Sequence, residues 1–368
     1  MKLLIGGSPC THWSIAQTRA RETEPEGIGW ELFLNYVIAK QKYNPDYFLY
    51  ENNKSMSPEI RDQITRELGV NPILINSALV SAQNRERLYW TNIPGVERPK
   101  DRGIVVQDIL ESGYSLREKA YAILSNSGGT TAEDMLKRRQ RNGAAEEVFV
   151  GECKTIDTAI PEIAKKIGYI PEMFNAYNRA EISEKAPTLS TGSMVTSSCA
   201  VTKFEKTEFR KTVEWPVYTV KNGFISIKGN EYRTKLKDGL YIIRKLTVIE
   251  CMRLQTVPEW YIFPVSPTQA YKMLGNGWTV DVIAHILSYC PGIFDEPIEV
   301  LSMYDGMSCG RLALEKMGAE ITRYYATEID KYAIKTTQAN FPDTIQLGDA
   351  FQIREEGWCL PKEREEPT

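Results

Sequence analysis

The chain has 368 residues, of which 42% are hydrophobic and 25% are charged, so it can bury a sizeable core and divide into one large domain and a smaller one. Its 45 basic and 48 acidic side chains give a formal net charge of -3, which argues against a protein that coats nucleic acid indiscriminately. No apolar run approaches the ~20 residues that span a bilayer, and the apolar N-terminal stretch is too short for a signal peptide, so we expect a cytoplasmic protein that is neither membrane-bound nor secreted.

The first 95 residues alternate strands with helices. In chain order the pattern predicts a strand at 2–5, a helix at 30–40, a strand at 47–50, a helix at 58–68, and strands at 72–77 and 87–91. Such alternation is typical of an α/β fold, in which a parallel sheet is covered by helices.

The middle of the chain loses this alternation, and the C-terminal part regains it. Residues from about 96 to 243 are richer in short alternating strands and turns, which predicts a separate small domain. The later elements are a strand at 299–304, a helix at 310–317, a strand at 321–327, a helix at 331–340 and a strand at 344–347.

A glycine turn and two acidic strand ends characterise the C-terminal stretch. The strand at 299–304 leads through Gly306 into a helix, whose first N–H groups can bind a carboxylate or phosphate. Glu328 ends the next strand, where an acidic side chain can accept from ribose hydroxyls, and Asp349 ends the third. These features predict a nucleoside-bearing cofactor and leave NAD and S-adenosylmethionine open. The alternative is that both acids only cap the helices that follow.

Reactive side chains also follow the N-terminal strands. Cys10 follows the first strand and a glycine-rich turn, so it is either a thiolate nucleophile at the carboxyl edge of the sheet or a small buried residue. Glu51 ends the next strand, where a carboxyl enclosed by apolar groups can donate a hydrogen bond or act as a general acid. Arg85 and Arg87 alternate onto one side and suit a phosphate or a base carbonyl, although surface ion pairing is the default for such a pair.

The cysteines and histidines carry no metal-binding pattern. The seven cysteines are odd in number, scattered and without a CxxC pair, and the two histidines, His12 and His285, lie far apart. We therefore expect reduced cysteines, no disulfide framework and no metal site.

Taken together, these motifs resemble the cytosine-5 DNA methyltransferase family. Three segments are similar to its catalytic signatures, in the family's own order: Pro9-Cys10, Glu51-Asn52-Asn53 and Gln83-x-Arg85-x-Arg87. The segment from Arg244 through Gln255 to Pro258 resembles the motif that supports the DNA-reading domain, and Gly275-Asn276-Gly277-Trp278-Thr279-Val280 resembles the motif that closes over the methionine end of the cofactor. The turn Tyr304 to Gly310, with Glu328 and Asp349, resembles its first three motifs. The resemblance covers roughly 1–95 and 240–353.

The resemblance implies a Rossmann-like methyltransferase sheet with a smaller, mostly β target-recognition domain. Residues 1–95 would form the catalytic half, 96–243 the DNA-reading domain, and 244–368 the remainder with the cofactor-binding half. Because the cofactor motifs come last instead of first, the chain resembles a circularly permuted member, in which joining the C-terminus to the N-terminus would restore the usual order. We therefore expect the termini to lie close together on one side of the sheet.

The resemblance also implies site residues. The catalytic residues would be Cys10, Glu51, Arg85 and Arg87. Contacts to the cofactor would come from Asn276, Trp278, Tyr304, Asp305, Gly306, Met307, Ser308, Cys309, Glu328, Ile329, Asp349 and Ala350, and contacts to DNA from Ser14, Gln83 and Arg244. Ser308 and Cys309 stand where the family often has glycines, and Ile329 stands where an aromatic often stacks on adenine; these variants resemble the mammalian de novo branch.

The implied reaction transfers a methyl group from S-adenosylmethionine to carbon 5 of cytosine and leaves S-adenosylhomocysteine. Cys10 would add to carbon 6, Glu51 would hydrogen-bond ring nitrogen 3 and the exocyclic amine, and Arg87 would donate to the carbonyl at carbon 2, with Arg85 supporting the loop or a phosphate. Because these atoms are inaccessible in a stacked duplex, the cytosine must be flipped out of double-stranded DNA. We expect such an enzyme in the cytoplasm of a bacterial or phage-infected cell.

Two basic segments are candidates for phosphate contacts, although a solvated charged face is the alternative for each. The first, 201–247, contains Lys203, Lys206, Arg210, Lys211, Lys221, Lys228, Arg233, Lys235, Lys237, Arg244 and Lys245 against five acidic residues; the second is Lys137-Arg138-Arg139-x-Arg141.

Three other functions compete with DNA methylation. A methyltransferase of the same family acting on RNA would have the same catalytic residues, and a binding protein without catalysis would have no need of Cys10, Glu51 and Arg87 together. An NAD-linked enzyme would leave the Asn276 motif unexplained. The recognition sequence, and whether a restriction enzyme accompanies the protein, are not encoded in any motif.

Overall fold

The computed structural model describes residues 1–14, 21–125, 127–129, 131–137, 142–147 and 217–361. The chain forms two compact units. The larger unit comprises Met1–Ile109, Arg117–Gly129 and Leu246–Thr368, and the smaller unit comprises Leu110–Leu116 and Thr130–Lys245. Residues 96–109 and 117–129, which the sequence analysis assigned to the DNA-reading domain, belong to the larger unit.

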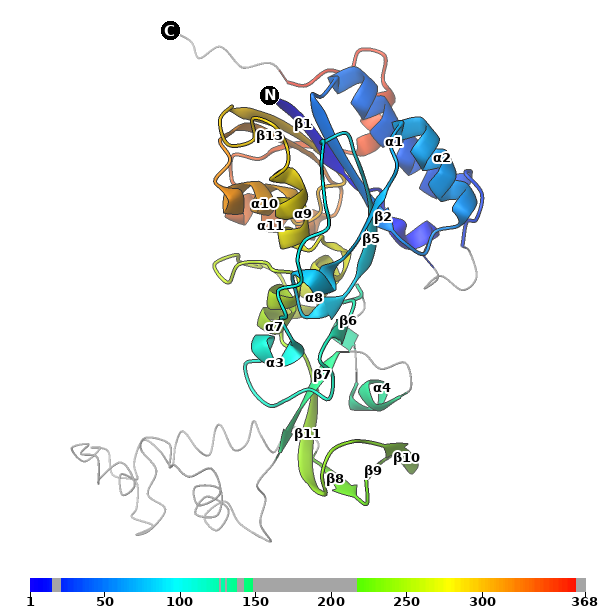
Figure 1. Ribbon diagram of the computed structural model, residues 1–368, viewed down its shortest axis with the longest axis vertical. Helices are drawn as coiled ribbons and strands as arrows, with labels where there is room; N and C mark the ends of the chain where they lie inside the picture. Colours follow the sequence, from blue (N-terminus) through cyan, green and yellow to red (C-terminus); the bar gives the residue numbers. More distant parts are fainter. Residues whose placement is uncertain (15–20, 126, 130, 138–141, 148–216, 362–368) are drawn as a thin grey trace, which may run out of the picture. The chain divides into compact units, whose positions relative to one another are not determined.

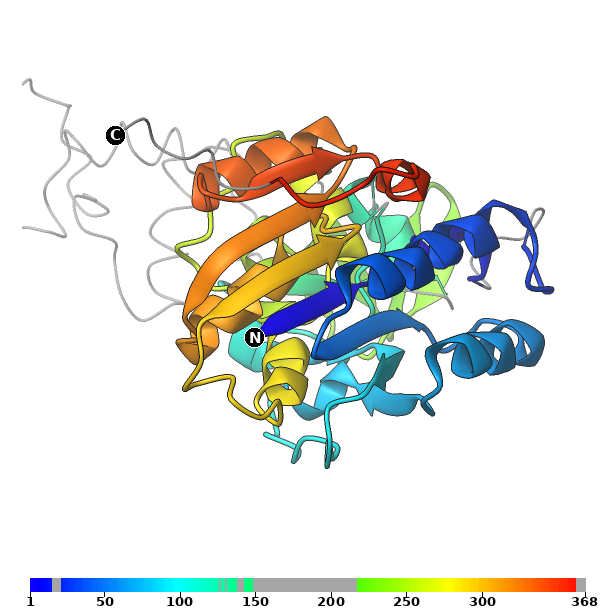
Figure 2. The same ribbon diagram turned by 90° about the horizontal axis from the view of Figure 1, so that it is seen from above.

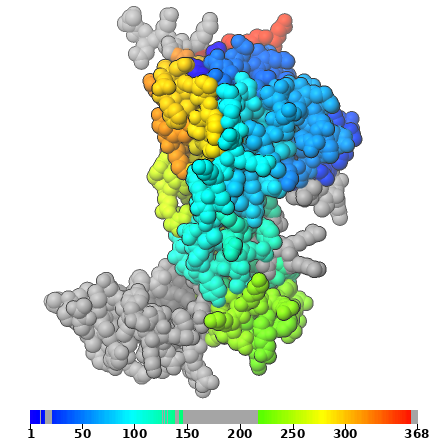
Figure 3. All heavy atoms as spheres, viewed as in Figure 1, coloured from blue at the N-terminus to red at the C-terminus, as the bar shows by residue number. Residues whose placement is uncertain are grey.

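The larger unit is built on a seven-stranded sheet in the order β14-β13-β12-β1-β2-β5-β3. Its strands are β1 (Lys2–Gly6), β2 (Tyr47–Asn53), β3 (Ile73–Asn76), β5 (Glu86–Thr91), β12 (Ile298–Met303), β13 (Ile321–Thr327) and β14 (Ile345–Gly348). Both ends of the sequence contribute to it: β1 pairs in parallel with β12 on one side and with β2 on the other (Figure 1). Figure 2 shows the dark blue β1 next to the yellow and orange strands of the C-terminal part, and the same two parts form one continuous body in Figure 3.

The direction of β5 departs from the predicted parallel sheet. β5 runs antiparallel to both β2 and β3, between which it lies. Only residues 77–85 connect β3 to β5, and a parallel crossover needs about a dozen residues or more. The short connection contains η2 (Ser77–Leu79) and β4 (Gln83–Asn84), the latter pairing with β6 (Ala120–Tyr121). The sheet is therefore mixed.

Helices cover both faces of the large sheet. One face carries α1 (Gly27–Tyr43), α2 (Pro58–Leu68) and η4 (Ala350–Arg354), which share a hydrophobic cluster with Leu4, Tyr50 and Met303 of the strands. The other face carries α10 (Cys309–Met317), where Gly310 lies against Ile5 and Tyr324. In Figure 1, α9 (Val280–Leu287) and α11 (Lys331–Asn340) lie on this side with α10.

Helix α2 illustrates how the sequence determines these elements. The Ser57 hydroxyl accepts from the Ile60 backbone N–H at the helix start, and Gly69 ends the helix with φ 73°. Ile60, Ile64 and Leu68 recur at a spacing of four residues and are buried, so each contributes about 1.5–3 kcal/mol to folding. Both ends of α2 coincide with the predicted helix at 58–68.

The other helices of the larger unit are α3 (Val106–Ile109), α7 (Val248–Leu254) and α8 (Pro267–Asn276), with η1 (Cys10–His12) and η3 (Ser127–Gly129) as single turns. No helix among the described residues is long and apolar enough to cross a membrane.

The smaller unit has a five-stranded antiparallel sheet in the order β10-β9-β8-β11-β7. Its elements are α4 (Ala132–Leu136), β7 (Gly143–Glu147), β8 (Val217–Lys221), β9 (Phe224–Ile227), β10 (Asn230–Arg233) and β11 (Gly239–Lys245). Met135 of α4 packs with Val220, Ile225 and Ile243 in a separate core. The middle of the chain therefore includes a mostly β unit, as its composition predicted.

The two chain ends can be followed only in part. The N-terminal amine of Met1 donates to the Pro297 carbonyl at 2.9 Å, next to the start of β12. At the other end, the carbonyl of Pro361 accepts from the Tyr325 hydroxyl of β13 at 3.4 Å. Residues 362–368 lie outside the described residues, so the proximity of the termini stays a prediction.

Candidate active site

A cavity of about 430 Å³ opens at the carboxyl ends of the strands of the larger unit. The turn after β1, the end of β2, and the segments after β12, β13 and β14 all line it, together with the turn between α8 and α9. This is the edge at which open α/β sheets bind ligands, and the volume lies in the range of small-molecule sites. The N-terminal and C-terminal motifs of the sequence therefore meet in one cavity.

The turn that carries Cys10 lies at this cavity. Cys10 is the first residue of η1, and its neighbours Pro9 and Thr11 line the cavity; the Cys10 side chain is outside the described structure. Residues of β2 stabilise this turn. The Ser8 and Tyr50 hydroxyls are 2.7 Å apart, and the Asn52 amide donates to the Ser8 carbonyl at 3.1 Å. The motif at the end of β2 thus supports the turn before Cys10.

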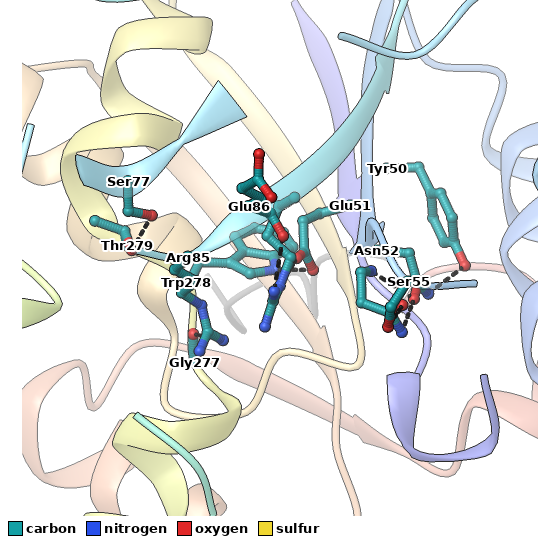
Figure 4. Close-up of polar contacts among 12 residues, drawn as sticks. Tyr50, Glu51, Asn52, Ser55, Ser77, Arg85, Glu86, Gly277, Trp278 and Thr279 are labelled. Atoms are coloured by element: carbon teal, nitrogen blue, oxygen red, sulfur yellow. Dashed lines mark hydrogen bonds and ion pairs between the residues drawn. The ribbon is translucent and has the colours of Figure 1, made fainter. Parts of the chain in front are cut away.

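Glu51 has a strong donor at each carboxylate oxygen. Arg87 Nε lies 2.9 Å from Oε1. Trp278 Nε1 donates to Oε2 at 2.9 Å, as Figure 4 shows. The side chains of Glu51 and Arg87 are 11% and 16% exposed. The carboxyl was expected in an apolar enclosure; instead it is hydrogen-bonded by a guanidinium and an indole. The sequence motifs did not reveal the contact with Trp278, which was assigned to the cofactor.

Arg85 does not share the surroundings of Arg87. Its guanidinium donates to the carbonyls of Ile123 and Gly275 at 3.2 and 3.1 Å, and to that of Gly277 at 2.9 Å (Figure 4). The residue is only 4% exposed. Of the two alternatives, loop support or a phosphate contact, these contacts correspond to loop support. Arg85 holds the turn that presents Trp278.

Gln83 also makes internal contacts. It is fully buried, and its amide donates to the Leu254 carbonyl at 2.7 Å and to Gln255 Oε1 at 2.8 Å. Gln255 donates in turn to the Leu274 carbonyl at 2.6 Å, and it accepts from the Thr279 hydroxyl at 2.8 Å. In this structure the Gln83 side chain is enclosed and contacts the end of α7, and its contact with DNA stays a prediction. Gln255 and Thr279 were not predicted as site residues.

The turn after β12 has an unusual backbone. Tyr304, Gly306 and Ser308 adopt φ values of 60°, 59° and 58°, a region that costs non-glycine residues energy and is frequent at functional sites. A methyl group on Gly306 would meet nothing within 4 Å, so the turn is open there. The Ser308 hydroxyl is held by Asp305 and lies 3.0 Å from the Thr337 hydroxyl. A serine thus occupies the left-handed position by means of side-chain hydrogen bonds.

The acidic strand ends both line the cavity and cap backbone groups. Glu328 Oε2 accepts from the Gly306 N–H at 2.7 Å, and Oε1 accepts from the N–H groups of Ile329 and Asp330 at 2.8 Å each. Asp349 accepts from the Phe351 N–H at 2.9 Å and caps η4. Asp349 thus caps the helix that follows it, whereas the N-cap of α11 is Asp330 and not Glu328. The cavity position leaves the ligand role open to both carboxylates.

The remaining predicted cofactor residues differ in accessibility. Met307, Cys309 and Ala350 are buried, although each contributes to the cavity wall, whereas Ile329 is 73% exposed. Burial raises the pKa of the Cys309 thiol to about 12, which excludes it as a thiolate nucleophile near neutral pH. Asn276 is exposed at the end of α8 and lines the same cavity.

The Asp305 carboxyl predicts a pH-dependent stability. Burial raises its pKa from 3.8 to about 6, against hydrogen bonds from Ser302, Ser308 and Tyr324 that lower it. Because the folded state binds this proton more tightly than the unfolded state, the contribution to the free energy of unfolding is full below pH ~4 and is lost as the pH rises through about 6. Asp305→Asn should therefore flatten the decline of unfolding free energy between pH 4 and pH 7 in urea titrations. A decline equal to that of the parent protein would contradict the assignment.

Some of the residues predicted to contact DNA belong to the smaller unit. The Arg244 guanidinium is buried and donates to the Ser112 carbonyl at 2.7 Å and the Lys245 carbonyl at 3.2 Å, both within this unit. Lys203, Lys206, Arg210, Lys211, Arg138, Arg139 and Arg141 lie outside the described residues, whereas Lys137, Lys221, Lys228, Arg233, Lys235 and Lys237 are exposed. Ser14, in the larger unit, is half-buried. Arg244 thus supports its own unit's backbone.

In the described ranges, no group of three His, Cys, Asp or Glu side chains could hold a metal ion.

The candidate site consists of the Cys10 turn, the Glu51–Arg87 pair, Trp278 and the turn from Tyr304 to Cys309.

Comparison with known proteins identifies relatives of this chain. The family model of the C-5 cytosine-specific DNA methylases matches residues 1–291. The type II methyltransferase M.FnuDI of Fusobacterium nucleatum is 25% identical over 300 residues, which cover 77% of this chain and 74% of that protein. The orphan methyltransferase M.SPRI of Bacillus phage SPR is also 25% identical, over 363 residues that cover 77% and 81%.

Among solved structures, the Dnmt2 methyltransferase of S. pombe is 13% identical with a TM-score of 0.34, over 72% of this chain and 74% of that one. The family model spans well over half of the chain. The chain therefore belongs to the C-5 cytosine-specific DNA methylase family and is an S-adenosylmethionine-dependent DNA (cytosine-5)-methyltransferase.

Proposed function

We propose that this enzyme methylates carbon 5 of a cytosine flipped out of a short, specific duplex DNA sequence, through a covalent adduct with Cys10. The observation that carries the proposal is the meeting of the Cys10 turn, the Glu51–Arg87 pair and the turn after β12 in one cavity. A nucleophile, a base-binding pair and a cofactor turn are the groups that this reaction requires within reach of one another.

Cytosine recognition follows from the ion pair. In the structure, Arg87 and Glu51 satisfy each other at 2.9 Å. A flipped cytosine would replace this contact: its carbonyl at carbon 2 accepts from Arg87, while its nitrogen 3 edge meets Glu51. A base with the reverse pattern of donors and acceptors would leave both charged groups unpaired, which is costly in a closed site.

The chemistry is an addition followed by an elimination. The Cys10 thiolate forms a bond to carbon 6, and the electrons of the 5,6 double bond move to carbon 5. The hydrogen bond from Glu51 to nitrogen 3 stabilises the negative charge that this addition places on the ring. S-adenosylmethionine would supply the methyl group that bonds to carbon 5, and its sulfonium sulfur would leave as the thioether of S-adenosylhomocysteine. Water then takes the proton from carbon 5, which restores the 5,6 double bond and releases the Cys10 sulfur as a thiolate. Cys10, Glu51 and Arg87 thus have separate tasks on one ring.

The cavity residues fit the cofactor. The open face at Gly306 leaves room for a ligand beside the backbone, and Glu328 and Asp349 carry carboxylates that suit ribose and other hydroxyl or amine donors. Ile329 is exposed beside Glu328 and offers an apolar surface to an adenine ring. We assign Tyr304 to Cys309, Glu328, Asp349 and Asn276 to this site, and the smaller unit to DNA reading.

The proposal is tested by methylation itself. The protein is incubated with mixed-sequence duplex DNA and tritiated S-adenosylmethionine, and the modified bases are mapped by sequencing. Label in 5-methylcytosine within one short sequence context is the expected result. Label on RNA alone, or cofactor binding without any label on DNA, would overturn it.

We also propose that the chain is a circularly permuted member of its family. Two observations support this: the family match ends at residue 291, before β12 begins, and β12 pairs in parallel with β1. Both observations fit a chain in which the cofactor-binding strands come last in the sequence but lie next to β1 in the sheet.

The permutation predicts an active rearranged enzyme. A variant in which residues 1 and 368 are joined by a flexible linker, and whose chain is opened in the turn at 291–297, should fold and methylate the same sequence at a rate within about tenfold of the parent. A control opened inside β1 should be insoluble or inactive, since this strand is central in the sheet. Loss of folding on opening at 291–297 would contradict the proposal.

A further inference from the structure

Trp278 links two sites that the motifs treat as separate. It follows α8 and lines the cavity near the cofactor turn, yet its indole N–H donates to Glu51 Oε2 at 2.9 Å (Figure 4). We propose that Trp278 is a positioning residue for Glu51, whose carboxylate it holds in the orientation that receives the cytosine. This inference rests on the proposed role of Glu51.

Gly7 makes room for this contact. A methyl group added to Gly7 would lie 2.8 Å from the Glu51 carbonyl oxygen, 3.1 Å from Glu51 Oε2 and 3.4 Å from Trp278 Nε1. The first distance is shorter than real contacts allow. The glycine before the Cys10 turn therefore lets the carboxylate and the indole approach each other at the floor of the cavity.

The turn that carries Trp278 is fixed from behind. Arg85 donates to the carbonyls of Gly275 and Gly277, and Gln255 donates to that of Gly277 at 3.2 Å. The Thr279 hydroxyl lies 2.8 Å from the Ser77 hydroxyl (Figure 4). Because buried polar groups with all these partners have one low-energy arrangement, the indole is presented from a rigid support.

The two donors of Glu51 have different fates when cytosine binds. Each carboxylate oxygen has two acceptor positions, and among the described residues Arg87 occupies one at Oε1 and Trp278 one at Oε2. Arg87 exchanges the carboxylate for the carbonyl of the base, whereas Trp278 has no group to exchange for and keeps its contact. The indole is thus the donor that holds Glu51 while the base is engaged.

The prediction is a selective loss of turnover. Trp278→Phe keeps an aromatic ring in the cavity wall and removes the indole N–H together with a few ring atoms, so kcat should fall by about tenfold, while KM for S-adenosylmethionine changes by less than about threefold. Trp260→Phe is the matched control, because Trp260 is 59% exposed and outside the cavity lining; its kinetics should equal those of the parent. Steady-state rates at varied cofactor and DNA concentrations measure both constants.

The dependence on Glu51 is tested in a second background. In a Glu51→Ala protein, adding Trp278→Phe should change the single-turnover rate by less than about twofold, since the partner is already gone. Two results would overturn the inference: a tenfold rise in KM for the cofactor with unchanged kcat, or an equal loss of single-turnover rate in the parent and in the Glu51→Ala background. Trp278 would then only line the cofactor-binding part of the cavity. If the parent protein does not methylate DNA, the proposed function is refuted. If the parent protein methylates DNA and the Trp278→Phe variant does so at the same rate, only the positioning role of Trp278 is refuted.

Discussion

Replacing Cys10 by serine is expected to reduce DNA methylation by about 10³-fold or more. A serine hydroxyl is far less ionised and less nucleophilic than a thiol near neutral pH, so addition to carbon 6 of cytosine becomes the step that fails. Binding of S-adenosylmethionine should be retained, because the cavity walls formed by the turn after β12 are unchanged. Transfer of tritium to DNA measures the first quantity, and isothermal calorimetry measures the second.

Cys359→Ser is the matched control for this substitution. Cys359 is exposed, and the same change of sulfur for oxygen there should leave the rate unaltered. Duplex DNA with fluorine in place of hydrogen at carbon 5 of the target cytosine adds a direct test, because carbon 5 then has no proton to lose, elimination is blocked and the adduct persists. A denaturation-resistant protein–DNA complex should form with the parent and the control, and not with Cys10→Ser. Retention of methylation within tenfold would mean that another group attacks the base.

Replacing Gly275 by alanine is expected to lower the free energy of unfolding by about 3 kcal/mol, the upper end of the usual cost of overpacking. The new methyl carbon would lie 2.4 Å from the Leu124 carbonyl carbon and 2.4 Å from the Ser125 nitrogen. Both atoms belong to backbone, which cannot turn aside as a side chain can. Since the Gly275 carbonyl also accepts from Arg85, the shift should displace the turn that carries Trp278 and reduce kcat as well.

Gly357→Ala is the control for the second substitution. A methyl group there would meet nothing within 4 Å, so urea unfolding should be the same as in the parent. Coincident midpoints for Gly275→Ala and the parent protein would show that α8 and the 124–125 segment are not in close contact.

Much of this fold could be predicted from local patterns. Helix α2 has a serine cap, a proline at its start, a glycine at its end and apolar residues four apart, so its bounds follow from neighbouring residues alone. The direction of β5 required a different kind of reasoning. Strand periodicity is the same in parallel and antiparallel pairs, and only the short connection from β3 indicates the reversal.

The site shows a similar division. Strand ends placed Glu51, Glu328 and Asp349 at one edge of the sheet, because parallel strands share an edge. The partners of a side chain depend on residues hundreds of positions away, as with Glu51 and Trp278. For the same reason Gln83, in a motif shared with DNA-modifying enzymes, was assigned to DNA although it lies inside the protein. A motif indicates that a residue type is required and leaves open which neighbour requires it.

The position of β1 affects how the protein folds during synthesis. Lys2 of β1 pairs with Glu299 of β12, so β1 is synthesised long before the strand that pairs with it on this side. Until then one edge of β1 presents unpaired backbone groups and the apolar residues Leu3, Leu4 and Ile5. Contacts of such long sequence separation form slowly, and exposed strand edges invite association with other chains. We therefore expect the segment that contains β1 to need protection from association until β12 has been synthesised.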